Sequence, residues 1–287
     1  MPRRCPLLVV AGLALAAIFA AASPLRAQDQ PAPQSAPTAP APASAAPAAS
    51  PPTITTDRPA ITDASTVVPV GYFVFENGFT QASSQGQNVV DAPESLVRFG
   101  LTAKTELRFT APDYFNDFSS GSVSGWGDLS LGVKQQLFAT KSNFDASLVV
   151  SLSFPTGAHA ISSHGYDPSV LLPWSVPISK NWTAAGMFGV LWPTVDRRRN
   201  VTGQASFYLD RQITGKWDAF LEYGGEYPQR GGPQHIIHAG TSYKLTPNQQ
   251  LDFHFGFGLS AAAPDHFIGF GYSFQLQALH REKPSGS

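Results

Sequence analysis

Thiols are almost absent from this chain. Cys5 is the only cysteine among 287 residues, and it lies in an N-terminal segment that is predicted to be removed. The mature protein then has no thiol for a disulfide or a metal site, which suits an oxidising compartment. No cofactor is predicted from the sequence.

A basic excess is also lacking. The 19 basic and 20 acidic residues give a formal charge of −1. Without Arg3, Arg4 and Arg26, which lie in the N-terminal segment, 16 basic residues remain against 20 acidic ones, a net charge of −4. This balance argues against nucleic acid as the main partner.

Long apolar runs are missing beyond the N-terminal segment. No later stretch reaches the roughly 18 apolar residues that a spanning helix needs, and the mean hydropathy is −0.08. If the mature chain crosses a membrane, it therefore does so with strands.

The first 27 residues have the order of a secretory signal. Arg3 and Arg4 are followed by an apolar stretch over residues 7–22, and Ala27 is a small residue at a cleavage point. Pro24 closes the apolar stretch, which is short for a spanning helix. We expect cleavage after residue 27; a retained N-terminal anchor is the alternative.

Residues 28–52 consist almost entirely of Ala, Pro, Ser and Gln. Such a segment cannot bury enough apolar surface to offset its chain entropy. We interpret it as a disordered periplasmic linker; a tether that touches peptidoglycan is the alternative.

From Gly71 onward the apolar residues recur with period 2, which puts alternate side chains on opposite faces of a strand. In the clearest example one face carries Phe144, Ala146, Leu148, Val150, Leu152 and Phe154, and the other carries Asp145, Ser147, Ser151 and Ser153. A secreted β-sandwich would show the same alternation. Strand number, loop lengths and tryptophan positions decide between the two folds.

About twelve such segments are predicted, and an even number closes an antiparallel barrel. They are 72–81, 94–101, 105–111, 126–137, 144–154, 166–176, 182–192, 200–211, 217–227, 234–245, 249–259 and 266–276. Short connections alternate with longer ones, as in barrels with short periplasmic turns and longer outer loops. The five tryptophans lie at or near segment ends, where interfacial girdles form: Trp126, Trp174, Trp182, Trp192 and Trp217. The predicted fold is therefore all-β, an antiparallel transmembrane barrel in the cell outer membrane.

Several short motifs resemble one family. They are residues 55–59 (TTDRP), 76–79 (ENGF), 101–109, 163–168 (SHGYDP), 232–235 (GPQH) and the last strand. Together they resemble the family of transporters named for the MetA pathway of phenol degradation, over about residues 53–276. The resemblance implies an outer-membrane barrel associated with transport, sometimes linked to aromatic catabolism.

The last strand is also similar to the signal read by the barrel-assembly machinery, which is an expected partner. Gly269, Tyr272 and Phe274 have the Gly-x-x-aromatic-x-aromatic spacing. Residues 277–287 follow as a C-terminal tail, whereas such signals usually end the chain.

Charged residues of both signs fall on the predicted inward faces. The candidates for the lumen and its selectivity are Glu76, Arg98, Glu106, Arg108, Asp128, Lys134, Asp145, Glu222, Lys244 and Asp252, with Asp210 and Asp218 beside them. Such charges create a field that selects permeants, or pair across strands and keep the barrel rigid. Both interpretations remain open.

Residues 53–70 precede the first strand and carry Asp57, Arg58 and Asp63. This segment is predicted to fold into the lumen as a plug, with Asp57 and Arg58 engaging charges of the wall. A periplasmic lead-in is the equal alternative.

Signals for chemistry are weak. His159, His164 and Asp167 lie near one predicted outer loop, and Asp265 and His266 near another. A Ser-His-acid site is recognised only by geometry, so an outer-membrane hydrolase stays the third hypothesis.

Metal binding has no better support. His235 and His238 are three apart on a strand and therefore face opposite sides, and no metal site is predicted.

The prediction is a non-enzymatic outer-membrane channel for passive passage of small solutes, hydrophobic or aromatic compounds among them. A structural or adhesive barrel without conduction is the alternative. Outer-membrane lipids and lipopolysaccharide are expected partners. Arg197, Arg198 and Arg199, in a predicted outer loop, either pair with lipopolysaccharide phosphates or are a solvated basic turn.

Overall fold

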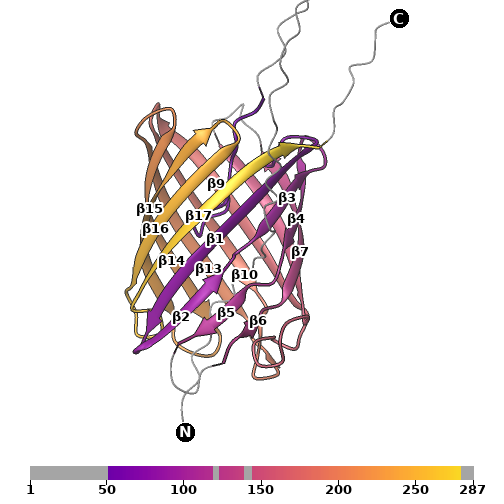
Figure 1. The fold of residues 1–287 in the computed structure, drawn as a ribbon, viewed down its shortest axis with the longest axis vertical. Helices are drawn as coiled ribbons and strands as arrows, with labels where there is room; N and C mark the ends of the chain where they lie inside the picture. The colour runs from indigo at the N-terminus through magenta and orange to yellow at the C-terminus, as the bar shows by residue number, and fades with distance from the viewer. Residues whose placement is uncertain (1–50, 119–122, 139–143, 279–287) are drawn as a thin grey trace, which may run out of the picture. The chain divides into compact units, whose positions relative to one another are not determined.

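The computed structural model describes residues 51–118, 123–138 and 144–278. The predicted signal peptide and nearly all of the predicted linker lie outside these residues. Within them the regular elements are all β-strands, and Figure 1 shows these strands arranged obliquely around a cylinder. No helix in this part of the chain is long and apolar enough to cross a membrane.

Twelve of the described strands form one closed antiparallel ring. In ring order they are β1 (Tyr72–Ser84), β3 (Leu96–Gly100), β4 (Thr105–Thr110), β7 (Leu129–Phe138), β8 (Asp145–Phe154), β9 (Asp167–Ser179), β10 (Trp182–Leu191), β13 (Thr202–Gln212), β14 (Trp217–Pro228), β15 (Gln234–Thr246), β16 (Gln249–Gly258) and β17 (His266–Gln277). β17 closes the ring on β1, from Tyr72↔Gln277 to Ser83↔His266. The predicted barrel is confirmed, and each predicted bound lies within three residues of the observed one.

The wall has its polar face inside and its apolar face outside. On β7, Lys134 is fully buried and Gln136 is buried, whereas Leu131 and Val133 are 47% and 42% exposed. On β16, Asp252 is buried while Phe257 is 52% exposed. A soluble sandwich would bury these apolar side chains, so this arrangement needs a lipid surround.

The two ends of the barrel differ in their connections. One end carries the short turns, such as the turn between β9 and β10, together with both ends of the described barrel chain. The other end carries the longer connections. By the usual topology of outer-membrane barrels these are the periplasmic and the outer end.

The long connections contain strands that the period-2 pattern missed. β2 (Gln87–Ala92), β5 (Tyr114–Asp117) and β6 (Gly125–Trp126) extend the sheet beyond the ring, and β11 (Thr194–Val195) pairs with β12 (Arg198–Arg199) in a small hairpin. The outer part of β1 pairs with β2, while its periplasmic part pairs with β3. The segment QNVVDA of β2 shows no apolar alternation, so the period-2 pattern did not reveal it.

Candidate functional site

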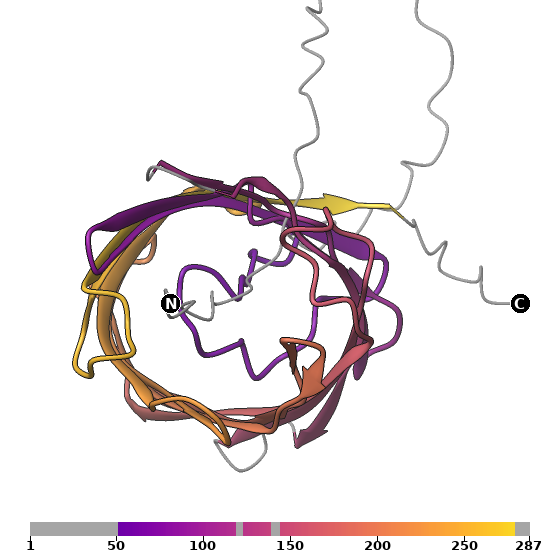
Figure 2. The same cartoon turned by 90° about the horizontal axis from the view of Figure 1, so that it is seen from below.

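Residues 53–70, named here the lumen segment, run through the inside of the barrel. The segment begins at the periplasmic end, where the Ile54 amide donates to the Pro247 carbonyl at 2.8 Å. It returns to that end, where the Gly71 amide donates to the Gly100 carbonyl at 2.8 Å. Figure 2, a view along the barrel, shows the indigo loop inside the ring of strands. The segment therefore lies inside the barrel, which is the placement that the first of the two sequence interpretations requires.

An ionic cluster fixes the first part of the lumen segment. Asp57 lies 3.3 Å from Arg98, 2.6 Å from Arg108 and 3.2 Å from Lys134. Arg98 in turn pairs with Glu76 at 2.9 Å and with Glu106 at 2.8 Å. These wall residues come from β1, β3, β4 and β7, which are neighbours in the ring.

Asp63 joins the same cluster through Arg108 at 3.2 Å. Four carboxylates therefore face three cations here. Buried charges are tolerated only when they are paired and hydrogen-bonded, and the lumen segment supplies two of the carboxylates.

Wall carboxylates also accept hydrogen bonds from the backbone of the lumen segment. Glu76 accepts from the amides of Asp57 and Arg58 at 2.9 and 2.8 Å. Glu106 accepts from the Val68 amide at 2.9 Å. A segment without regular structure needs such partners for its amides, and bonds to a carboxylate are the stronger kind.

Glu222 of β14 holds the far side of the loop. It accepts from the amides of Ile61 and Thr62 at 2.8 Å each and from the Thr62 hydroxyl at 2.6 Å. The same hydroxyl lies 2.6 Å from Ser206 Oγ on β13. The lumen segment is therefore bound to opposite sides of the wall.

Two histidines continue from Glu222 along the wall. His238 Nδ1 lies 2.9 Å from Glu222, and His238 Nε2 lies 2.9 Å from His254 Nδ1. His254 shares the polar face of its strand with Asp252, but neither histidine was among the predicted lumen residues. Their cross-strand register, with His238 opposite Glu222, is the signal that would have found them, and it requires known strand pairing.

Arg58 and Ser65 complete the attachment. Arg58 pairs with Glu94 and lies 3.3 Å from Asp252 of β16. Ser65 Oγ lies 2.7 Å from Ser175 Oγ of β9, and its carbonyl accepts from Ser147 of β8 at 2.5 Å.

The remaining predicted lumen residues lie away from this cluster. Asp128 accepts from the amides of Gly157 and Ser163 at 2.8 and 2.9 Å and so organises an outer loop. Lys244 pairs with Asp218 at 3.0 Å at the periplasmic end. Asp145 begins β8 at the same end and is half-buried.

A cavity of about 400 Å³, named here the vestibule, lies between the lumen segment and the β9 to β16 side of the wall. Its wall carries the rings of Tyr208 and Phe220, which stack with centroids 5.1 Å apart. Short side chains, Ser175 and Thr183 among them, leave the remaining room. Tyr208 also donates to Asp210 at 3.3 Å.

The weaker chemical candidates are occupied by structural contacts. The His159 and His164 rings lie 4.8 Å apart, and Asp167 binds Thr194 and Arg199. Asp265 accepts from the Gln85 amide at 2.9 Å, and His266 is exposed at the start of β17. Over the described ranges, no group of three or more His, Cys, Asp and Glu residues could hold a metal ion.

Comparisons with known proteins agree with this architecture. The model of the family described as "Putative MetA-pathway of phenol degradation" matches residues 56–276. The COG4313 outer membrane channel from Pseudomonas putida F1 superimposes with a TM-score of 0.60 at 16% identity, over 74% of this chain and 98% of that one. The NanC porin gives 0.52 at 11% identity, over 71% and 100%. No curated protein matches.

Proposed function

The chain belongs to the MetA-pathway family of phenol degradation, and we propose that it is an outer-membrane channel for passive passage of small solutes, aromatic compounds among them. In the conformation described, the lumen segment closes the channel. The lumen charges hold that segment and set the ion preference of the open state. The protein is non-enzymatic in this proposal.

The observation that carries the proposal is the lumen segment itself. Its ends lie at the periplasmic end, and its middle is bound to Glu222, which faces the ionic cluster across the lumen. It has no strand or helix of its own over residues 53–69. Between its two ends the segment is held by contacts with wall side chains, and these can break without breaking the barrel's hydrogen-bonded ring.

Aromatic solutes fit the vestibule. The stacked pair Tyr208 and Phe220 offers an aromatic face, and such rings favour offset or edge contacts with a further ring. Asp210 lies beside them as an acceptor for a hydroxyl group. The family description, which names phenol degradation, supports the same class of solute.

A reducible disulfide between the lumen segment and the wall tests the proposal. Thr62 and Ser206 place their hydroxyl oxygens 2.6 Å apart, so the double variant Thr62→Cys/Ser206→Cys, in a Cys5→Ser background, should form a disulfide between plug and wall. The oxidised protein in liposomes should show little flux of ions, sugars and phenol. Reduction should restore flux to the level of the Cys5→Ser protein.

The single variant Thr62→Cys in the same background is the control, since it carries one of the two cysteines and cannot form the disulfide. Equal flux before and after reduction would refute the lumen segment as a gate. No flux of any solute, even after deletion of residues 53–68 from barrels that remain heat-modifiable, would favour the structural barrel.

A further inference from the structure

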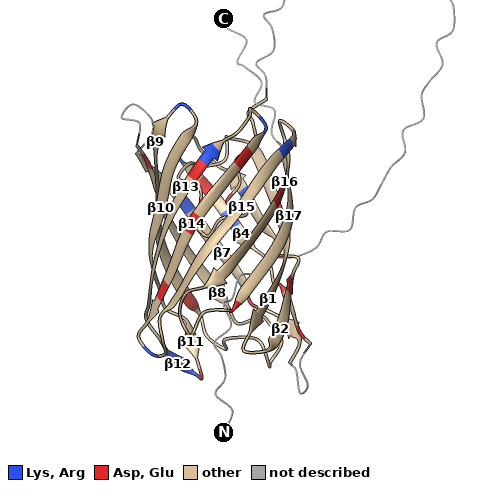
Figure 3. Cartoon of the chain, turned by 90° about the vertical axis from the view of Figure 1, so that its left-hand side faces the viewer, with Lys and Arg blue, Asp and Glu red and all other residues tan. Residues whose placement is uncertain are grey.

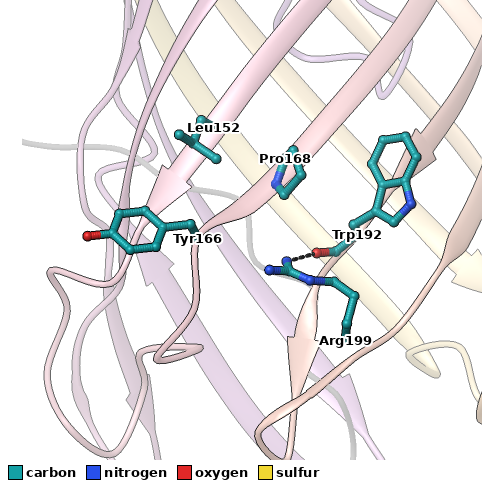
Figure 4. Close-up of a pocket in the computed structure, with 5 residues that line it drawn as sticks. All are labelled: Leu152, Tyr166, Pro168, Trp192 and Arg199. Carbon is teal, nitrogen blue, oxygen red and sulfur yellow. Dashed lines mark hydrogen bonds between the residues drawn. The ribbon is translucent and has the colours of Figure 1, made fainter.

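A shallow groove lies on the outward face of the wall near its outer end, with a volume of about 390 Å³. Leu152 of β8 stands opposite Pro168 of β9, and the Trp192 amide donates to the Pro168 carbonyl at 3.0 Å. These three residues therefore form one row across neighbouring strands. Figure 4 shows them with Tyr166, which is 60% exposed.

A cationic group borders this apolar row. Arg199 Nη1 donates to Asp167 at 2.7 Å and to the Trp192 carbonyl at 2.5 Å, the second bond being drawn in Figure 4. Both bonds use Nη1, and within the described part of the chain no acceptor is bonded to its Nη2 or Nε. The guanidinium thus keeps donors for a ligand.

Three further arginines lie close to it. Arg197 and Arg198 are exposed in the β11–β12 hairpin, which appears in blue at the lower end of Figure 3. Arg230 Nη1 donates to the Arg199 carbonyl at 3.3 Å. The chain as a whole is slightly acidic, so this positive patch is a local feature.

The hairpin is firmly built. Asp167 accepts from the Thr194 amide at 3.0 Å and from its hydroxyl at 2.7 Å, in addition to Arg199. Asp196 and Arg197 have φ of 49° and 61°, the left-handed pair that a tight two-residue hairpin turn requires. The arginines are therefore presented from a fixed position.

An apolar groove beside clustered guanidinium groups suits a ligand with acyl chains and phosphates, since arginine binds phosphate in a bidentate manner. At the outer end of an outer-membrane barrel, that ligand is the glycolipid of the outer leaflet. We propose that this groove and hairpin bind lipid A. An acyl chain lies against Leu152, Pro168 and Trp192, and a phosphate lies at the arginines.

Native mass spectrometry of the full chain in detergent, with bisphosphorylated lipid A, tests the proposal. Arg197→Gln/Arg198→Gln removes two charges and leaves Arg199 to hold the hairpin. If each arginine contributes about 1 kcal/mol, affinity should fall on the order of 30-fold. Arg211→Gln is a control for the loss of an arginine elsewhere, because Arg211 lies 5.3 Å from the Trp182 ring at the periplasmic end. Lipid A binding should be unchanged in this variant.

Trp192→Ala tests the apolar half and should weaken lipid A binding as well. The proposal is overturned if the double variant binds lipid A as the native chain does. It is also overturned if lipid A stripped of its phosphates binds equally, or if phosphatidylglycerol displaces lipid A at equal concentration. Solute flux should be unchanged in the double variant, so this test is independent of the proposed channel function.

Discussion

The two sides of the lumen are built differently. The side formed by β1, β3, β4 and β7 is packed with paired charges around Asp57, and Arg98 and Lys134 there are fully buried. The side formed by β9, β10, β13 and β14 carries hydroxyls and an aromatic pair and leaves the vestibule open. One side therefore anchors the lumen segment, while the other leaves space for a solute.

The largest effect is expected from breaking the packed side at its centre. Arg98→Met leaves Glu76, Glu106 and Asp57 without their shared cation. An uncompensated buried charge costs roughly 3 to 5 kcal/mol of unfolding free energy. A folded barrel that has not been heated migrates differently from the unfolded chain in gel electrophoresis. The temperature at which this folded band disappears should be well below that of the native barrel.

Arg211→Met is the control for this change, because Arg211 lies on an exposed position at the periplasmic end. If Arg98→Met lowered the unfolding temperature as little as Arg211→Met does, the ionic cluster would not stabilise the fold.

An added arginine distinguishes the two sides directly. Ser147 is fully buried and donates to the Ser65 carbonyl, so Ser147→Arg should displace the lumen segment and cost about 1 to 3 kcal/mol by overpacking. Thr183 lines the vestibule, and Thr183→Arg should change the free energy of unfolding by no more than about 0.5 kcal/mol. Urea unfolding in detergent measures both.

The variants Ser147→Arg and Thr183→Arg should also differ in conductance. We expect Ser147→Arg to raise the open fraction and Thr183→Arg to narrow the pore. Equal behaviour of the two variants would remove the distinction between a packed and an open side.

A pH-dependent effect concerns the outer end of the packed side. Burial, together with the nearby charges of Asp91 and Glu94, raises the pKa of Asp113 from 3.8 to about 10. Asp113 accepts from the Glu94 amide at 2.7 Å, a bond that asparagine can keep. The Asp113 carboxyl group thus binds its proton more tightly in the folded state than in the unfolded state. The stabilisation from this proton is fully present below pH 3.8 and is lost as the pH rises through about 10.

Native protein should therefore lose stability between neutral pH and pH 10, while Asp113→Asn should lose less. Thermal unfolding at a series of pH values measures the difference. Parallel curves for the two proteins would contradict the raised pKa.

The fold followed from the sequence because strands that face lipid on one side and water on the other alternate locally. Lys134 was assigned inward and Val133 outward from their neighbours alone, and both assignments are confirmed. The strands outside the ring were missed because β2 carries no apolar alternation, although it pairs with the outer part of β1 and with β5.

For the site too, one part followed from the sequence and another part from the tertiary structure. By itself the sequence determined which residues point inward, because side-chain direction in a strand depends only on parity. Which inward groups meet was decided by the tertiary structure, since Asp57 and Lys134 are 77 positions apart and Arg58 and Asp252 are 194 apart. Strand register and the path of residues 53–70 bring such groups together, and neither leaves a local pattern in the chain.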